Sequence, residues 1–236
     1  MYPKDWEWAF SNYGSNELKS LLTTSALSVS AVFGGVLDRH QSVLIEAVRA
    51  ADILGAQTVF AVAPVSGTVS LNECIDIVGS ACDLLKPYGQ TMAIHNHAGT
   101  FMESIRDSHK LCNSINRDNF GLCIDSLHFA LFDDEIEKKL DPVLPYIKYV
   151  HLKDINKSPN EIASLVPKHT WKWGSLGFLE ETYIDLEMGI IDNKAIAKRI
   201  KESGYSGWWL PEIERSRIDR LLHAKQNAEI VRRYLV

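Results

Sequence analysis

The stretch "TMAIHNHAGT" (residues 91–100) is a short apolar run that ends in two histidines, His95 and His97. In an extended strand, residues two apart lie on the same face, so both imidazoles would project together. The run therefore predicts a buried strand whose carboxyl end carries polar groups. Taken alone, the pair fits a metal site, a pair of catalytic bases or two structural histidines.

Similar apolar runs recur along the chain and alternate with amphipathic stretches of helical spacing. The runs that predict strands are 5–10, 28–33, 58–64, 91–97, 121–126, 149–154 and 207–214. The stretches that predict helices are 15–26, 39–56, 70–89, 100–116, 133–147 and 192–205. Seven strands alternating with helices predict an α/β fold with parallel strands and helical crossovers.

An open doubly wound sheet and a closed (β/α) barrel both fit this alternation. No glycine-rich phosphate loop follows an early strand, which argues against nucleotide-binding folds. Polar residues follow several strands, and in TIM barrels the carboxyl ends of the strands form the active site. We therefore predict a TIM-type barrel. No linker or low-complexity tract divides the chain, so residues 1–236 are expected to form one domain.

The amino-acid composition limits the kinds of partner that the protein is expected to bind. The net charge of −5 over 236 residues argues against nucleic acid, which requires a basic face. No apolar run approaches the roughly 20 residues of a membrane span, and the N-terminus does not resemble a signal peptide. The four cysteines form no C-x-x-C motif and are expected to be buried thiols. These features predict a cytoplasmic protein without a membrane partner.

Metal-capable side chains lie at the carboxyl ends of four of the predicted strands. They are His95, Asp125, His151 and Glu212, with His97, His128 and Lys153 beside them. Carboxylates and imidazoles from separate strand ends suit a divalent cation such as Mn²⁺, Co²⁺, Mg²⁺ or Zn²⁺. Each residue alone also has an ordinary structural explanation, for example a helix cap for Asp125. Their recurrence at one end of successive strands favours a metal site.

Four motifs and their order resemble the xylose isomerase-like barrel superfamily: "AIHNHAGT", "CIDSLH", "YVHLKD" and "GIIDNKAIAKRIKESGYSGWWLPEIE". That superfamily includes sugar isomerases and epimerases, inosose dehydratase, dehydroshikimate dehydratase and endonuclease IV-type repair enzymes. Its metal is typically held by Glu, Asp, His and Glu. The resemblance implies Asp125, His151 and Glu212 as ligands, His128 as the D-x-x-H histidine near substrate or metal, and Lys153 as a substrate contact.

The sequence departs from the superfamily pattern in two places. Many members have Glu where this chain has His95, so either His95 replaces that ligand or the protein supplies three ligands. The "HNHAGT" form is similar to inosose dehydratase-like members. The text "YPKDWEWAFSNYGSNELKSLL" resembles the usual second strand, which implies a barrel without its first βα unit. Because such a barrel has open edges, we expect a homo-oligomer or a partner subunit.

These features together predict a metal-dependent isomerase, epimerase or dehydratase acting on a small keto-sugar or cyclitol through an enediolate. The expected metal ligands are His95, Asp125, His151 and Glu212. His97 is the expected base or acid, and His128 and Lys153 would position substrate hydroxyls. One alternative is a non-catalytic or partner-dependent barrel subunit that has lost full metal ligation. Endonuclease IV-type DNA repair is the other, and the acidic charge balance disfavours it.

Overall fold

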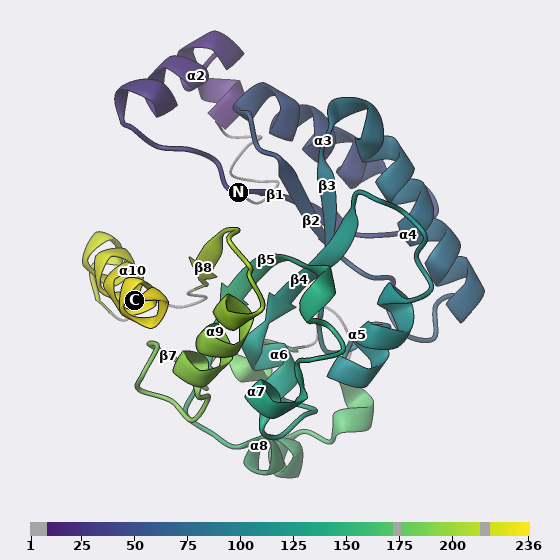
Figure 1. The fold of residues 1–236 in the computed structure, drawn as a ribbon, viewed down its shortest axis with the longest axis vertical. Helices are drawn as coiled ribbons and strands as arrows, with labels where there is room; N and C mark the ends of the chain where they lie inside the picture. Colours follow the sequence, from purple (N-terminus) through teal and green to yellow (C-terminus); the bar gives the residue numbers. More distant parts are fainter. Residues whose placement is uncertain (1–8, 172–175, 213–217) are drawn as a thin grey trace.

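The computed structural model describes residues 9–171, 176–212 and 218–236. Its centre is a six-stranded parallel sheet in the order β1-β2-β3-β4-β5-β8, which curls into part of a barrel (Figure 1). The strands are β1 (Val32–Val36), β2 (Thr58–Val62), β3 (Thr91–His95), β4 (Phe120–Asp125), β5 (Ile147–Leu152) and β8 (Trp209–Pro211). The predicted α/β class with parallel strands and a TIM-type curl is confirmed.

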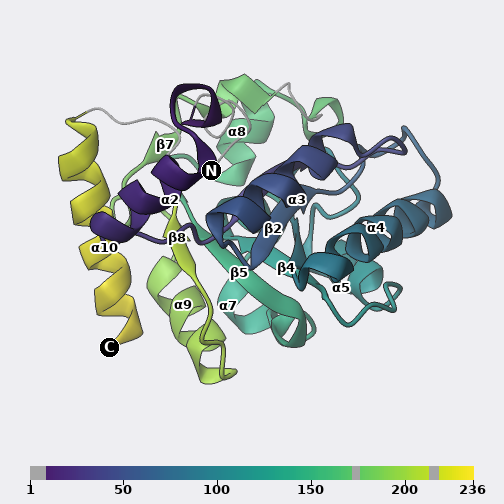
Figure 2. The same cartoon turned by 90° about the horizontal axis from the view of Figure 1, so that it is seen from above.

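Helices follow the strands and cover the outer face of the sheet (Figures 1 and 2). The α-helices are α2 (Ser15–Thr24), α3 (Ser42–Leu54), α4 (Leu71–Leu85), α5 (Ile105–Cys112), α6 (Ser126–Ala130), α7 (Ile136–Lys139), α8 (Pro159–Leu165), α9 (Asn193–Glu202) and α10 (Arg220–Leu235). Short 3₁₀ turns are η1 (Lys86–Tyr88), η2 (Leu144–Tyr146), η3 (Lys168–Thr170) and η4 (Leu176–Leu179). A capping box begins α4, because Ser70 and Glu73 exchange side-chain and backbone hydrogen bonds.

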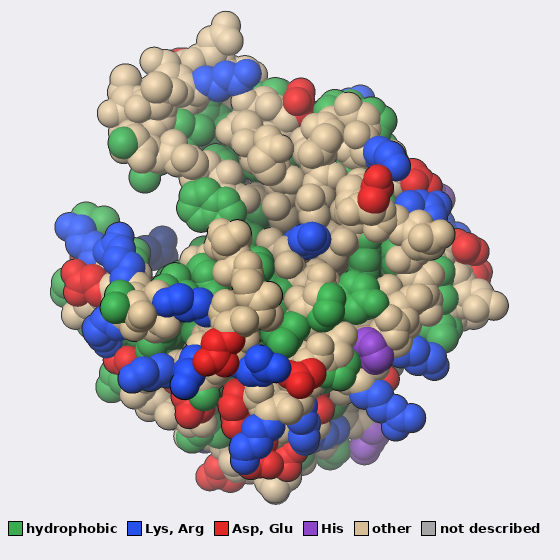
Figure 3. All heavy atoms as spheres, in the orientation of Figure 1, with side chains coloured by type: hydrophobic (Ala, Val, Ile, Leu, Met, Phe, Trp, Pro, Cys, Tyr) green, Lys and Arg blue, Asp and Glu red, His purple; other side chains and the backbone are tan. Residues whose placement is uncertain are grey.

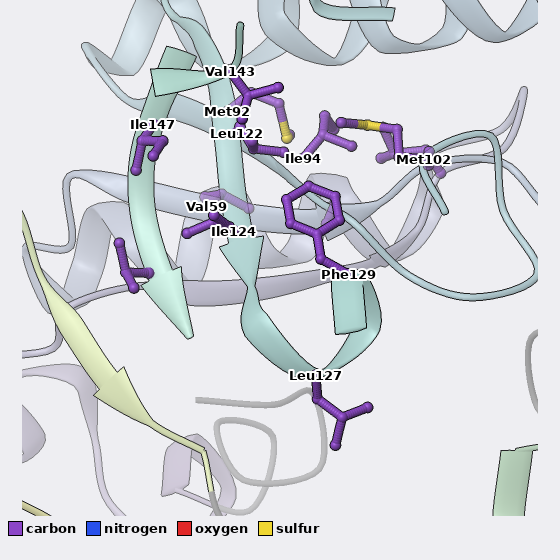
Figure 4. Packing of buried hydrophobic residues seen from close by; sticks show 14 of the residues in the cluster. Val59, Met92, Ile94, Met102, Leu122, Ile124, Leu127, Phe129, Val143 and Ile147 are labelled. Atoms are coloured by element: carbon purple, nitrogen blue, oxygen red, sulfur yellow. The ribbon is translucent and has the colours of Figure 1, made fainter. Parts of the chain in front are cut away.

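Side chains alternate between the two faces of each strand, so the buried residues form two separate layers. In β4, Leu122 and Ile124 point outward and pack in the large cluster between sheet and helices (Figure 4). Cys123 points inward and packs with Phe60 and Tyr149 in a smaller cluster on the concave face. Because side chains two apart share a face, Asp125 lies on the concave face above Cys123. The concave face therefore carries an apolar floor with polar groups at the strand ends.

Two expected strands differ from the structure. Residues 5–8 of the strand expected over 5–10 lie outside the described part, whereas Ala9 and Phe10 are helical, and Tyr13 N–H bonds Ala9 O at 2.8 Å. The strand expected over 28–33 begins only at Val32 and continues through two glycines. Gly35 has φ +79°, at the place where the β1–β2 register shifts. This bulge explains why the expected strand ended before the glycines, since glycine pairs normally indicate a turn.

The segment that follows β5 contains further regular structure. It contains α8, and its ends form an antiparallel pair of short strands, β6 (Asp154–Ile155) and β7 (Tyr183–Ile184). Six strands rather than seven form the main sheet of the described chain, and β1 and β8 are its two ends. Among the described residues, no helix combines the length and apolar character needed to cross a membrane.

Candidate metal centre

The four expected metal ligands meet at the carboxyl ends of four neighbouring strands. His95 and Asp125 are the last residues of β3 and β4, and Asp125 is paired in register with His151 of β5. Glu212 directly follows β8, where its backbone N–H donates to Leu152 O of β5 at 3.1 Å. Parallel strands in this register place the four side chains side by side on the concave face.

The donor atoms of these residues are close enough to share one ion. One donor atom each from His95, Asp125, His151 and Glu212 lies within 4.8 Å of the others. Nε2 of His95 is 3.3 Å from Oδ2 of Asp125, and Nδ1 of His151 is 2.6 Å from Oε2 of Glu212. Asp125 and His151 are fully buried.

Buried nitrogens with no hydrogen bond support a metal centre. Nδ1 of His95 and Nε2 of His151 make no hydrogen bond to any residue that the structure describes. Buried polar atoms of a folded protein nearly always have partners, so such atoms call for an explanation such as a bound ion. Two imidazoles and two carboxylates also form a donor set that suits Mn²⁺, Co²⁺ or Zn²⁺. The residues present therefore fit a divalent cation.

The two oxygens of Asp125 have different partners. Oδ1 accepts a hydrogen bond from His128 N–H at 3.0 Å and caps α6. Oδ2 faces His95 and the ammonium of Lys153, each at 3.3 Å. The ordinary interpretation of Asp125 as a helix cap and the metal-ligand interpretation are therefore compatible, because each uses one oxygen.

Lys153 brings a positive charge into the cluster. Its side chain is 4% exposed, and Nζ lies 3.3 Å from Asp125 Oδ2 and 3.2 Å from Glu212 Oε2. Burial raises the pKa of both carboxyl groups, but the Lys153 ammonium and the neighbouring histidines outweigh it and hold each pKa well below its ordinary value. Both acids are therefore ionised at neutral pH, in the form that binds a cation.

His97 and His128 form a ring pair beside this cluster. Their ring centroids are 3.7 Å apart, and each ring lies within 6 Å of His95. Burial, followed by the neighbouring His95, lowers the pKa of His97 to about 3. Burial and the adjacent His97 hold the pKa of His128 well below its ordinary value. Both imidazoles are therefore neutral at pH 7.

The backbone carbonyl and N–H of Ala98 set opposite tautomers on these two rings. Its carbonyl lies 2.8 Å from Nδ1 of His97, and a carbonyl only accepts, so His97 Nδ1 carries the proton. Its N–H donates to Nδ1 of His128 at 3.5 Å, so the His128 proton is on Nε2. His97 therefore presents an acceptor nitrogen where His128 presents a donor.

Three polar residues that position the site were not predicted from the sequence. Asn96 bridges β3 to β4, because its amide accepts from Asp125 N–H at 2.6 Å and donates to Asp125 O at 3.1 Å. Ser126 Oγ accepts from Lys153 N–H at 3.0 Å, and Asn193 donates to Lys153 O at 2.9 Å. In the sequence, each of these residues is only a polar residue next to a strand end, and such residues are also common in ordinary loops.

Features outside the cluster do not join it. Trp171 is buried against Phe132 and Phe178, so it fills a gap in the core and does not offer an open face to a sugar. Trp173 lies outside the described residues. A cavity of about 590 Å³ runs between Leu131, Glu135, Lys168 and Ile191, and none of the seven candidate residues, all described, lines it.

Comparison with known proteins assigns the family. The sequence model of the xylose isomerase-like TIM barrel family matches residues 17–234. The chain belongs to this family. The resemblance inferred from the four motifs is thereby confirmed, and the partial barrel is a member of a TIM barrel family.

The chain is similar to proteins that act on inososes. It is 28% identical over 161 residues to an inosose dehydratase of Serratia proteamaculans, covering 65% of this chain and 50% of that protein. It is 27% identical over 135 residues to an inosose isomerase of Bacillus subtilis, covering 56% and 43%. The crystal structure of the IolI protein with a zinc atom superposes with TM-score 0.73 at 22% identity, over 100% of this chain and 84% of that one. The chain spans about half the length of the curated relatives it matches.

Proposed function

We propose that this protein is a metal-dependent isomerase, epimerase or dehydratase that acts on a small keto-sugar or cyclitol. The observation that carries the proposal is the convergence of His95, Asp125, His151 and Glu212 at adjacent strand ends, within 4.8 Å of one another. The names of the relatives, inosose dehydratase and inosose isomerase, point to the same substrate class. The zinc atom of the IolI structure supports a divalent cation in this fold.

The proposed reaction is removal of a proton next to a carbonyl, which gives an enediolate of the substrate. His95, Asp125, His151 and Glu212 would hold a divalent cation, which when bound supplies Lewis-acid polarisation of that carbonyl. His97 accepts the proton at Nε2, the acceptor position of its tautomer. Its low pKa makes it a weak base, and negative charge developing on the substrate raises that pKa as the proton moves.

In this proposal, His128 and Lys153 interact with oxygen atoms of the substrate. Nε2–H of His128 donates a hydrogen bond to a hydroxyl next to the reacting carbon. The buried ammonium of Lys153 stabilises the oxyanion that forms, and it can return a proton to a leaving hydroxyl in the dehydratase variant of the reaction. The choice between isomerisation, epimerisation and loss of water then depends on where the proton returns.

The test is exchange of the substrate's proton with solvent. The protein is stripped with a chelator, reloaded with Mn²⁺, Co²⁺, Mg²⁺ or Zn²⁺, and incubated in D₂O with an inosose or a ketohexose. Proton NMR should show loss of the signal next to the carbonyl, only with metal, and at least about 100-fold more slowly for Asp125→Asn. Asp118→Asn, on the exposed Lys86 pair, is the control and should exchange normally. Absence of exchange with every metal and both substrate classes contradicts the proposal.

A second candidate is a barrel that holds no metal and works as a binding or partner subunit. The observation that favours it is Lys153, whose ammonium lies within 3.3 Å of both carboxylates and balances one of their two negative charges without an ion. Metal analysis separates the two candidates, because this one predicts no bound divalent ion after reconstitution with Mn²⁺.

We also propose a domain organisation, a cellular location and an association state for the chain. The family match runs over residues 17–234, which supports one domain over 1–236. The four cysteines are free and buried, as expected in the reducing cytoplasm. The open ends of the sheet at β1 and β8 support association with a second copy or a partner subunit. The main ligand in this proposal is a small-molecule substrate.

A further inference from the structure

Cys123 lies directly beside the metal centre and has no part in the proposed reaction. It is two residues before Asp125 on β4 and shares its inward face. In the sheet it is paired with His95 on β3 and with Tyr149 on β5. Its side chain is fully buried.

Cys123 forms a second donor set with two of the same histidines. One donor atom each from His95, Cys123 and His151 lies within 4.8 Å of the others. The two sets therefore share both imidazoles and differ in the remaining donors. The upper set adds the carboxylates of Asp125 and Glu212, and the lower set adds one sulfur.

The histidines that the sets share have nitrogen atoms available for either. Nδ1 of His95 and Nε2 of His151 make no hydrogen bond to the described residues, and both side chains are more than nine-tenths buried. The cysteine is thus not an isolated thiol, because it shares a donor set with two buried histidines that each have a nitrogen without a hydrogen bond to the described residues. Phe60 closes the floor, with its ring centroid 5.0 Å from that of His151.

Sulfur and oxygen donors select different ions. Thiolate is a soft ligand that favours Zn²⁺ and other thiophilic cations, whereas carboxylates suit Mn²⁺ and Mg²⁺. Two imidazoles, one thiolate and an open fourth position also resemble the three-ligand arrangement of catalytic zinc sites. The sulfur-containing set would therefore favour Zn²⁺ and other thiophilic cations, and the carboxylate set would favour Mn²⁺ and Mg²⁺.

The thiol is protonated before an ion binds. Cys123 is fully buried, and burial favours the neutral thiol over the charged thiolate. A bound cation reverses the local charge and deprotonates a coordinating thiol. The sulfur–metal bond forms as the S–H bond breaks and the proton passes to solvent, with no change of oxidation state.

We propose that His95, Cys123 and His151 form a second, sulfur-containing metal set that takes thiophilic cations one layer deeper in the barrel than the carboxylate set. This inference rests on the proposed function, since both sets use His95 and His151. A cation held by the lower set would lie further from the Asp125 and Glu212 carboxylates and from the substrate. Thiophilic ions such as Cd²⁺ therefore act as inhibitors that the chain binds tightly.

Cobalt spectroscopy tests the lower set without an activity assay. Co²⁺ added to the chelator-stripped protein should give visible d–d bands and, in the near ultraviolet, a thiolate-to-cobalt charge-transfer band. Cys123→Ser should lose the charge-transfer band and keep the d–d bands, because the carboxylate set still binds. Cys82→Ser is the matched control, since Cys82 is also fully buried but lies on α4, and it should keep both.

Competition between ions gives a second measurement. The ratio of Cd²⁺ to Mn²⁺ affinity should fall at least about tenfold in Cys123→Ser, a loss no smaller than that seen for removal of an outer-shell partner. Cys123→Ala replaces the serine variant if that one does not fold, and a wild-type cobalt spectrum that lacks the charge-transfer band is decisive by itself.

The outcomes separate this inference from the proposed function. Wild-type d–d bands without a charge-transfer band overturn the sulfur set and leave the carboxylate centre intact. A charge-transfer band that persists in Cys123→Ser and Cys123→Ala also overturns it. No cobalt bands of either kind in the wild-type protein overturn both proposals.

Discussion

The ammonium of Lys153 lies 3.3 Å from Oδ2 of Asp125, the carboxylate oxygen that also faces His95. A lysine and a divalent cation would therefore compete for the same buried negative charge. In the absence of an ion, the Lys153 ammonium partly compensates the negative charges of Asp125 and Glu212. This relationship makes the stability of the metal-free protein depend on Lys153.

Replacing Lys153 by methionine should destabilise the metal-free protein by roughly 3–5 kcal/mol, because two buried carboxylates lose their counter-charge. Mn²⁺ should bind at least as tightly as before and restore most of the melting temperature. Lys86→Met, at an exposed pair with Asp118, should change the melting temperature little. Thermal melts with and without Mn²⁺ measure both effects, and a variant insensitive to Mn²⁺ contradicts this account.

Replacing His97 by asparagine should flatten the fall in stability at acid pH. The folded pKa of His97 is about 3 and its ordinary value is 6.5, so protonation favours the unfolded chain. His97 therefore costs no stability above pH 6.5 and progressively more as pH falls from 6.5 towards 3. Urea unfolding across this window should show a smaller pH slope for His97→Asn than for wild type. Equal slopes, or the same flattening in the exposed control His40→Asn, contradict the prediction.

Much of the site could be predicted because the groups that bind metals are few and occur at strand ends. His95, Asp125, His151 and Glu212 each follow an apolar run, and the parallel arrangement then brings them together. The sequence could not show that Asn96 and Ser126 continue the bonding between strands, because their partners lie about thirty residues away. The low pKa of His97 depends on burial by the folded chain, so its protonation could not be predicted either.

The limits of the fold prediction have similar causes. The bulge at Gly35 and the close contact at Gly34, where an added Cβ would lie 2.7 Å from Leu44 Cδ1, require glycine inside a strand. Periodicity treats those glycines as a break. The β6–β7 pair joins residues about thirty apart through strands too short to give an alternating pattern.

Replacing Asn96 by alanine should weaken the metal site through Asp125. The variant removes two buried hydrogen bonds that join the ends of β3 and β4, which costs roughly 2–3 kcal/mol. Because Asp125 is then less well positioned, Mn²⁺ affinity should fall about 10–100-fold. Calorimetric titration measures this, with the exposed Asn116→Ala as control. Unchanged affinity in Asn96→Ala contradicts a positioning role.

Association of two or more copies of the chain should depend on the exposed apolar side chains of α10. Figure 3 shows the surface hollowed between α2 and α10, and on α10 Leu221 is 63% exposed with Leu222 beside it. We expect light scattering to give a dimer or larger species, and the Leu221→Ser/Leu222→Ser variant to dissociate. Leu165→Ser, at an equally exposed leucine on α8, should not dissociate. A stable wild-type monomer contradicts the prediction.

The metal content of the reconstituted protein tests the central claim most directly. Wild-type protein and Asp125→Asn are stripped with a chelator, reloaded with Mn²⁺, passed through a desalting column and analysed by atomic mass spectrometry. The account predicts about one ion per wild-type chain and a large loss in Asp125→Asn, since that variant replaces a buried charged donor by a neutral one. Wild-type protein that retains no more Mn²⁺ than Asp125→Asn would contradict it.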